Sequence, residues 1–168
     1  MSRDFPDWVH PGKSAAARRI FSGTVPVERL SRLAGLILEG QGGEIHFKVA
    51  FAHDDQQQVR AEVEVSGSVP LECQRTLKAF DHAVEGSSTV GIVLSDAEAD
   101  RLPDDYEPKV CPDSRLSLID LVGEEVLLSL PLVPVDPESS RLEASPKTND
   151  TYRPFEALSD LKRKRDDH

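Results

Sequence analysis

A long stretch in which apolar and polar residues alternate is the feature that most restricts the fold of this chain. Odd-numbered positions from Ile45 to Phe51 and from Val59 to Val65 are apolar, whereas the positions between them are mainly charged or small. A period of two places one side of a strand in the core and the other in water. The polar residues 53–56 separate the two runs, so the sequence predicts an antiparallel hairpin.

The second run continues beyond a break. Gly67 and Ser68 interrupt it, yet Val69, Leu71 and Cys73 resume the alternation. A glycine within a strand pattern often marks a kink or bulge in a long curved strand, although a new turn fits equally well here. Either alternative produces a strongly bent sheet. Two further strands are expected at residues 79–84 and 89–94, on either side of a small polar loop at 85–88.

The most apolar segment, residues 116–130, predicts a helix. Ser117 or Asp120 can cap its start, and Pro131 ends the helical pattern. Six residues are expected to share one face: Leu118, Leu121, Val122, Glu125, Leu128 and Leu130. Three prolines within residues 131–137 favour an extended strap that carries the chain across the core.

A second helix is expected at residues 26–39. Pro26 suits a first helical position, Leu30, Leu33 and Ile37 fall on one face, and Gly40 stands where a helix ends.

These elements predict an α+β fold in which a curved antiparallel β-sheet is packed by two main helices. The core domain is expected at residues 23–137, after a flexible basic N-terminal arm at 1–22. A flexible linker at 138–153 and a short docking helix with a basic tail at 154–168 would follow. Residues 96–107 hold six acids and predict a solvated acidic loop that starts as a short helix at Ser95.

The net charge of −10 is unevenly distributed along the chain. Residues 1–35 carry +3, residues 36–161 carry −15 and residues 162–168 carry +2. Basic ends can contact a phosphate backbone, whereas an acidic middle attracts a basic protein. Both classes of partner therefore remain open.

Metal chemistry finds little support in the residue pattern. The two cysteines, Cys73 and Cys111, are not spaced as a C-x-x-C pair, because Thr76 occupies the third position after Cys73. We expect both to be reduced thiols, with no metal site and no cofactor.

Catalytic patterns are missing as well. The chain has no G-x-S-x-G elbow and no phosphate-binding loop. Glu124 and Glu125 are neighbours on a predicted helix, where side chains point about 100° apart, so they cannot act together as an acid and a base, and one is expected to face solvent. The sequence thus predicts a protein that is not an enzyme.

No apolar run approaches the roughly 20 residues that a membrane span needs, and the segment after Met1 lacks the apolar core of a secretory signal. We therefore expect a cytoplasmic protein with no membrane partner and no small-molecule substrate.

RNA phosphate contacts would fall to exposed cations. The candidates are Arg18, Arg19, Arg75, Lys78, Lys162, Arg163, Lys164 and Arg165. For the last four, a solvated tail that only aids solubility is an equal alternative.

Four sequence blocks carry a resemblance to a known family. They are L-E-C-Q-R-T at 71–76, I-D-L at 119–121, E-E-V-L-L-S-L-P-L-V-P at 124–134 and P-F-E-A-L-S-D-L-K at 154–162. In this order the chain resembles the YceD family, the large ribosomal RNA subunit accumulation proteins of bacteria and plastids. The residues that match its motifs are Glu72, Cys73, Arg75, Asp120, Glu124, Glu125, Pro131, Pro134, Phe155 and Leu158.

The resemblance implies a non-enzymatic role in synthesis, processing or accumulation of 23S ribosomal RNA, through RNA binding. It also implies that Arg75 and Lys78 touch RNA, although Arg75 could equally pair with Glu72 or Glu125. Many relatives have a second cysteine where this chain has Thr76, which speaks against a family-type zinc site here. The alternative function is an acidic protein that chaperones a basic ribosomal protein through residues 96–107.

Overall fold

The computed structural model describes residues 5–141. The chain divides into two compact units, Met1–Asp136 and Pro137–His168, and the account below concerns the first unit unless stated otherwise. Its elements, in chain order, are β1 (Trp8–Val9), α1 (Pro11–Ala16), β2 (Ile20–Pro26), η1 (Val27–Arg29), η2 (Ser31–Leu33), β3 (Glu44–His53), β4 (Val59–Glu72), β5 (Ala79–Val93), α2 (Asp96–Ala99), β6 (Glu107–Val110), β7 (Leu116–Ser117) and α3 (Leu118–Ser129).

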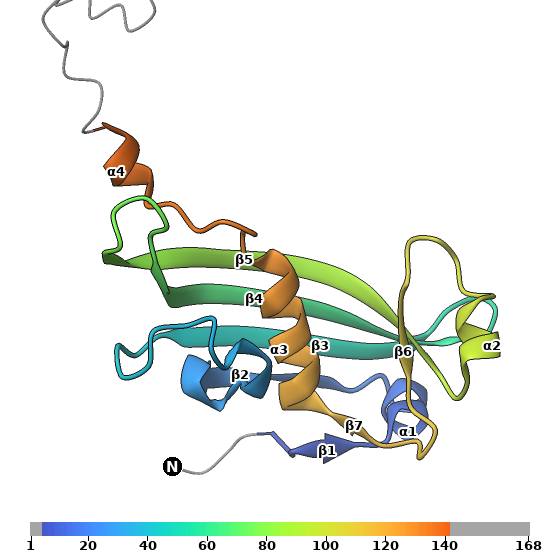
Figure 1. The fold of residues 1–168 in the computed structure, drawn as a ribbon. Helices are drawn as coiled ribbons and strands as arrows, with labels where there is room; N and C mark the ends of the chain where they lie inside the picture. The colour runs from blue at the N-terminus through green and yellow to red at the C-terminus, as the bar shows by residue number, and fades with distance from the viewer. Residues whose placement is uncertain (1–4, 142–168) are drawn as a thin grey trace, which may run out of the picture. The chain divides into compact units, whose positions relative to one another are not determined.

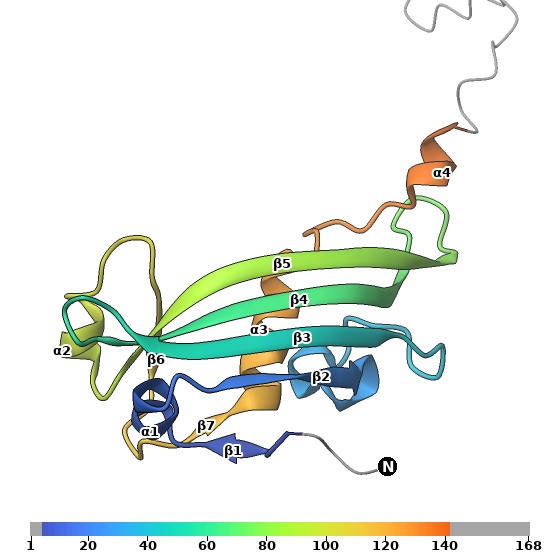
Figure 2. The ribbon, with the colours of Figure 1, turned by 180° about the vertical axis from the view of Figure 1, so that it is seen from behind.

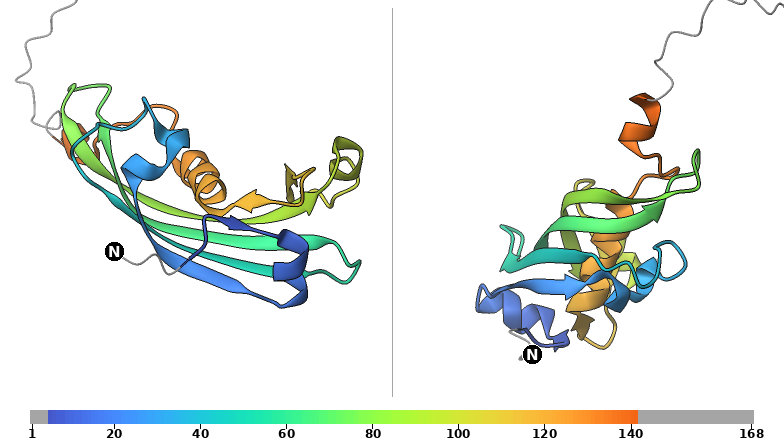
Figure 3. Two further views of the ribbon diagram at one scale, coloured as in Figure 1. Left: turned by 90° about the horizontal axis from the view of Figure 1, so that it is seen from below. Right: turned by 90° about the vertical axis from the view of Figure 1, so that its left-hand side faces the viewer.

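The expected α+β class with a curved sheet is confirmed. Five strands form an open sheet in the order β2-β3-β4-β5-β6, and only the β5–β6 pair is parallel. Helix α3 crosses the sheet, as Figure 1 shows. Figure 3 shows that the sheet is bent and that α3 lies on its concave side. The core of valine, leucine, isoleucine and phenylalanine side chains fills the space between them.

The predicted hairpin is confirmed by the register of β3 and β4. Ile45 pairs with Gly67, and the ladder continues to His53 opposite Val59. β4 remains a single strand through Gly67, which adopts a φ of 155°. The alternative of one long strand is therefore the one that occurs. Its register with β5 is unbroken through Gly67, so the strand bends at a kink and has no bulge there.

The predicted loop at residues 85–88 is wrong. β5 runs without a break, and Glu85–Ser88 pair with Val63–Ser66 of β4. The segment looked like a loop because its residues are polar and small. In the fold, Gly86 instead gives room to α3, since a Cβ atom there would lie 2.2 Å from the Ser129 hydroxyl oxygen.

One edge of β5 is open over most of its length. β6 pairs with β5 only at Val90–Val93. Among residues 5–141, no strand pairs with this edge, the one that faces away from β4, between Ala79 and Thr89. This open edge is 11 residues long.

The helix predicted at residues 26–39 is wrong, so the sheet is packed by one main helix and not by two. Two short 3₁₀ turns, η1 and η2, take its place. Leu30, Leu33 and Ile37 are nevertheless buried, because consecutive turns can bring residues three and four apart to the same side. Gly35 has a φ of 78°, and the Leu38 backbone N–H bonds to the Pro70 carbonyl instead of continuing a helix.

The N-terminal segment from Phe5 onward packs on the sheet and is not a loose arm. Phe5, Val9 and Ala15 are buried, and the Phe5 ring meets Phe47 edge to face with 4.8 Å between centroids. Gly23 makes this approach possible, since a Cβ atom there would lie 2.7 Å from the Phe5 ring.

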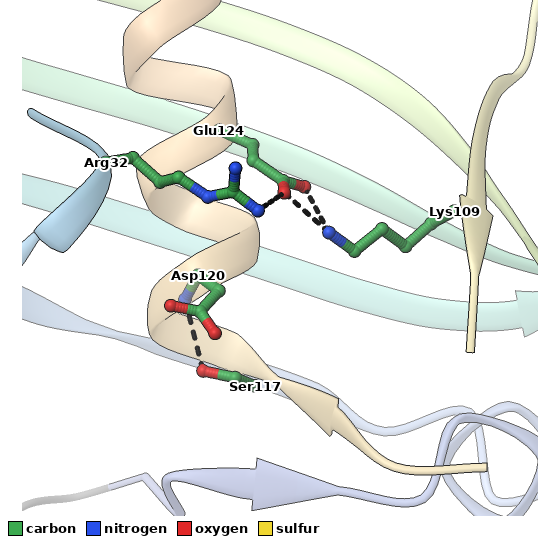
Figure 4. Close-up of polar contacts among 5 residues, drawn as sticks. All are labelled: Arg32, Lys109, Ser117, Asp120 and Glu124. Atoms are coloured by element: carbon green, nitrogen blue, oxygen red, sulfur yellow. Dashed lines mark hydrogen bonds and ion pairs between the residues drawn. The ribbon is translucent and has the colours of Figure 1, made fainter. Parts of the chain in front are cut away.

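The helix predicted from residue 116 is confirmed as α3. Ser117 caps it by accepting a hydrogen bond from the Asp120 backbone N–H at 3.2 Å (Figure 4). Leu118, Leu121, Val122 and Glu125 are buried as expected. Leu128 is 68% exposed, so its place on the buried face is wrong.

The proline-rich strap does not cross the core. Residues 131–136 are mostly exposed, and they are held against the β4–β5 turn by a hydrogen bond of 2.9 Å from the Gln74 N–H to the Pro134 carbonyl. In the second unit, Pro137–Arg141 form helix α4 at the start of the expected flexible linker. The rest of that linker and the docking helix and tail at 154–168 lie outside the described residues. None of the helices in residues 5–141 has the length and apolar character that crossing a bilayer requires.

Candidate nucleic-acid interface

The cations proposed from the sequence lie at opposite ends of the sheet. The Arg19 carbonyl accepts a hydrogen bond from Phe51, which pairs with Ala61 of β4. Arg75 and Lys78 belong to the turn that follows Glu72, eleven residues farther along β4. At about 3.3 Å per residue this is roughly 35 Å of strand. The fold therefore separates the two pairs, and Lys162–Arg165 lie outside the described residues.

Arg18 and Arg19 sit on a tight turn between α1 and β2. The Arg18 N–H bonds to the Ala15 carbonyl at 3.0 Å and the Arg19 N–H bonds to the Ser14 carbonyl at 2.9 Å. Arg18 adopts a φ of 47°, a left-handed conformation that reverses the chain direction. Both side chains are exposed, so the turn presents two guanidinium groups to solvent.

Beside this turn lies a groove of about 310 Å³ that we call the Trp8 groove. Its lining combines aromatic, aliphatic and basic residues: Pro6, Trp8, Val9, His10, Lys13, Ser14, Ala17, Arg19 and Phe21. They come from β1, α1 and the start of β2. Trp8 is 54% exposed, although it is the one tryptophan of the chain and a large apolar side chain. An exposed aromatic ring next to cations is typical of surfaces that bind unpaired bases.

A second segment, far away in the sequence, completes this region. The Arg115 guanidinium carbon lies 5.1 Å from the centroid of the Trp8 ring, a cation–π contact. β1 pairs with β7, which brings Trp8 opposite Ser117, and His10 bonds through Nδ1 to the Ser114 carbonyl at 2.9 Å. The ring is thus held by a short two-stranded sheet.

The two segments that surround the Trp8 groove are basic in a protein that is acidic as a whole. The β3–β4 turn and α2, at the same end of the sheet, carry the acids Asp54, Asp55, Asp96 and Glu98. Within residues 5–22 and 111–117 there are four cations, Lys13, Arg18, Arg19 and Arg115, against two carboxylates, Asp7 and Asp113. A local excess of positive charge attracts phosphate even when the net charge of the protein is negative.

The uncovered face of the sheet has the opposite character. Figure 2 shows this side of β2–β5, across the middle of which no described helix lies. The strand register places acidic side chains along it: Glu62, Glu64, Asp81 and Glu85. Lys48 is already paired there with Glu64 at 3.1 Å. This face therefore repels a phosphate backbone and is unsuited to RNA.

The neighbouring acids of α3 have separate structural roles. Figure 4 shows Glu124 between two cations: Arg32 Nη2 lies 2.6 Å from Oε1, and Lys109 Nζ lies 2.5 Å and 2.7 Å from the two oxygens. Glu125 is buried and accepts a hydrogen bond from the Ser88 hydroxyl. The expectation that one of the two simply faces solvent is wrong, because each has a partner in the sheet or in a neighbouring element.

The β4–β5 turn holds Cys73 in a polar setting. Hydrogen bonds to the sulfur, first from the Thr76 side chain and then from the Asp136 backbone N–H, lower the pKa of the Cys73 thiol from 9.0 to about 6. The Asp136 N–H lies 3.4 Å from Sγ. Burial raises the pKa of the Cys111 thiol instead. Both cysteines are free, as expected.

We expect Cys73 to be a thiolate at neutral pH. Absorbance at 240 nm should show a thiolate titrating near pH 6 that is lost in Cys73→Ser and kept in Cys111→Ser. Because the folded pKa lies below the unfolded one, the stabilisation is present above the unfolded pKa and declines as the pH falls toward 6. The free energy of unfolding of the wild type should therefore drop more steeply between pH 9 and 6 than that of Cys73→Ser. Equal slopes would contradict the assignment.

Sequence reasoning singled out Arg18 and Arg19 but not Trp8, Lys13 and Arg115, which the fold places near them. The available signal was a lone tryptophan between Asp7 and a basic segment, at a position with no apolar periodicity. Among the side chains of the described residues, no group of three or more histidine, cysteine, aspartate or glutamate residues is arranged to hold a metal ion.

Comparison with known proteins gives two agreeing results. The family model described as "Large ribosomal RNA subunit accumulation protein YceD" matches residues 61–162, a range that contains the four blocks at 71–76, 119–121, 124–134 and 154–162. A protein of Haemophilus influenzae named "Large ribosomal RNA subunit accumulation protein YceD" is 30% identical over 170 residues, which cover 95% of this chain and 97% of the relative. No solved structure matches the chain significantly. On both the family match and the nearly full-length similarity, the chain belongs to the YceD family.

Proposed function

We propose that this protein supports the accumulation of large-subunit ribosomal RNA by binding that RNA or its precursor, without catalysing a reaction. The biological role is inferred from the name of the relative from Haemophilus influenzae, which aligns over nearly the whole chain. The basic segments around the Trp8 groove support the mode of action, since they gather cations that no sequence block placed together.

Arg18 and Arg19 are the phosphate contacts that we propose for this end of the sheet. They project from a turn whose backbone is fixed by hydrogen bonds, so little backbone conformational entropy is lost when they meet a ligand. Arg75 and Lys78, at the other end of the sheet, and Lys162–Arg165 remain proposed as secondary contacts. One RNA segment long enough to span the sheet would be needed to reach both ends.

Salt dependence of binding to a large-subunit RNA fragment tests this proposal. Each phosphate contact to single-stranded RNA contributes about 0.7 to the slope of log affinity against log salt. Arg18→Ala combined with Arg19→Ala should therefore reduce the slope by about 1.4. The control, Arg29→Ala combined with Lys48→Ala, removes the same charge from other parts of the first unit and should leave the slope within about 0.7 of the wild type.

Two results would contradict the proposal. One is a wild-type affinity below that of a bovine albumin reference at the same salt concentration. The other is an equal loss of slope in the two double variants, because this would make net charge, and not the Arg18–Arg19 turn, responsible for binding. Deletion of Lys162–Arg165 in the same assay measures how much these four cations contribute to the affinity and to the salt slope.

A second candidate function is favoured by the acidic sheet face. Glu62, Glu64 and Glu85 lie on an uncovered surface that suits a basic ribosomal protein better than RNA. Capture of such a protein that persists after ribonuclease treatment, and that is lost when these three glutamates are changed to glutamine, would support this role. Neutralisation of the acids in residues 96–107 tests the alternative acidic surface in the same way.

A further inference from the structure

We infer that the Trp8 groove binds an unpaired nucleotide by stacking its base on Trp8, so that the RNA taken by this protein is single-stranded at this point. The inference rests on the proposed RNA binding and deepens it. It concerns a class of substrate, single-stranded RNA as opposed to duplex RNA.

The first argument is the exposure of the ring. A tryptophan that only stabilises the fold buries most of its surface, yet Trp8 leaves 54% of its surface in water. Its neighbour on the strand, Val9, is buried and anchors β1 in the core. The ring is therefore presented on a fixed backbone, as a stacking platform requires.

The second argument is the cation on the ring. Arg115 lies over Trp8 at 5.1 Å and limits the positions that the ring can adopt. A planar guanidinium can itself stack on a base or bind a phosphate, and Trp8 is 54% exposed with Arg115 in this position. Trp8 and Arg115 together offer one base-stacking and one phosphate-binding group.

The third argument is the chemistry of the walls. Lys13 and Arg19 line the same groove as Trp8, and Pro6, Val9 and Phe21 add apolar surface. The lining contains no carboxylate among the described residues. Positive walls beside an aromatic ring complement a nucleotide, whose phosphate is negative and whose base is flat and weakly polar. A duplex would keep its bases stacked inside and could not use the ring.

Because Trp8 is the only tryptophan, its intrinsic fluorescence reports on this groove alone. Titration of the full chain with a single-stranded eight-nucleotide RNA should quench the emission, and a blunt duplex of the same length should leave it nearly unchanged. Affinities of the variants are measured by fluorescence anisotropy of end-labelled RNA, because the variants lack Trp8. Trp8→Ala should weaken binding of the single strand by about 10-fold, since stacking on one aromatic ring accounts for about that factor or more. Trp8→Phe keeps an aromatic ring and should stay within about 3-fold of the wild type.

Leu36→Ala serves as the control, because Leu36 is similarly exposed at 53% but lies outside the groove. It should not change affinity. Circular dichroism melting curves confirm that each variant is folded, and the exposure of Trp8 makes a large loss of stability unexpected.

The outcomes distinguish a failure of the stacking site at Trp8 from a failure of the proposed RNA binding. If the wild type binds RNA but its emission does not change and Trp8→Ala binds equally well, the stacking site is refuted while RNA binding stands. If quenching by the duplex equals quenching by the single strand, the preference for unpaired RNA is refuted. If neither RNA binds, both the stacking site and the proposed function are refuted.

Discussion

Replacing Gly67 with alanine should destabilise the protein by about 3 kcal/mol, one of the largest effects expected for a single methyl group. A Cβ atom at this position would lie 2.1 Å from the Glu44 carbonyl oxygen, and the φ of 155° is one that residues with side chains rarely adopt. The clash is with backbone, which a rotamer change cannot relieve. Urea denaturation followed by circular dichroism should show a midpoint lower by roughly 1.5 M.

Gly12→Ala is the matched control for this substitution. Gly12 lies in α1, and nothing stands within 4 Å of the position its Cβ atom would occupy. An alanine in a helix reduces the entropy of the unfolded chain, so the variant should be unchanged or more stable by about 0.5 kcal/mol. If both glycine variants lose the same stability, the backbone conformation of Gly67 and its close approach to Glu44 are not the cause.

Leu118→Ala should cost about 3 kcal/mol, because Leu118 is fully buried at the start of α3 and its removal leaves a cavity. Leu128→Ala makes the same chemical change on the same helix at a position that is 68% exposed. It should alter the free energy of unfolding by no more than about 0.5 kcal/mol. Similar losses in the two variants would contradict the exposure of Leu128 at the C-terminal end of α3.

The fold could be predicted from the sequence wherever a pattern had only one structural solution. The alternation from Ile45 to Val65 permits a strand and excludes a helix, and Gly67 just after it marks the kink. The capping residue Ser117 and the helix breaker Pro131 likewise enclose α3 on both sides. In these segments, local preference and tertiary packing agree.

The helix at residues 26–39 could not be excluded in the same way. A spacing of three and four residues between apolar positions fits an α-helix, but a series of 3₁₀ turns buries the same side chains. The decisive contact is the hydrogen bond from Leu38 to Pro70, which joins segments 32 residues apart. No local pattern reports such a contact.

The candidate site was only half predictable for a related reason. Arg18 and Arg19 are visible as a basic pair in the sequence, but Trp8 meets Arg115 only because β1 pairs with β7. Each of these strands has two residues, too few for any periodicity. The partners are separated by more than 100 positions, so their encounter is a property of the fold.

The open edge of β5 also bears on how copies of this protein behave at high concentration. Unpaired backbone groups along Ala79–Thr89 could seed edge-to-edge association between two molecules. Asp81 and Glu85 project from this edge strand, so two edges that met would bring carboxylates of both copies together. The acidic side chains that repel phosphate from the sheet therefore also disfavour edge-to-edge association, through repulsion between like charges.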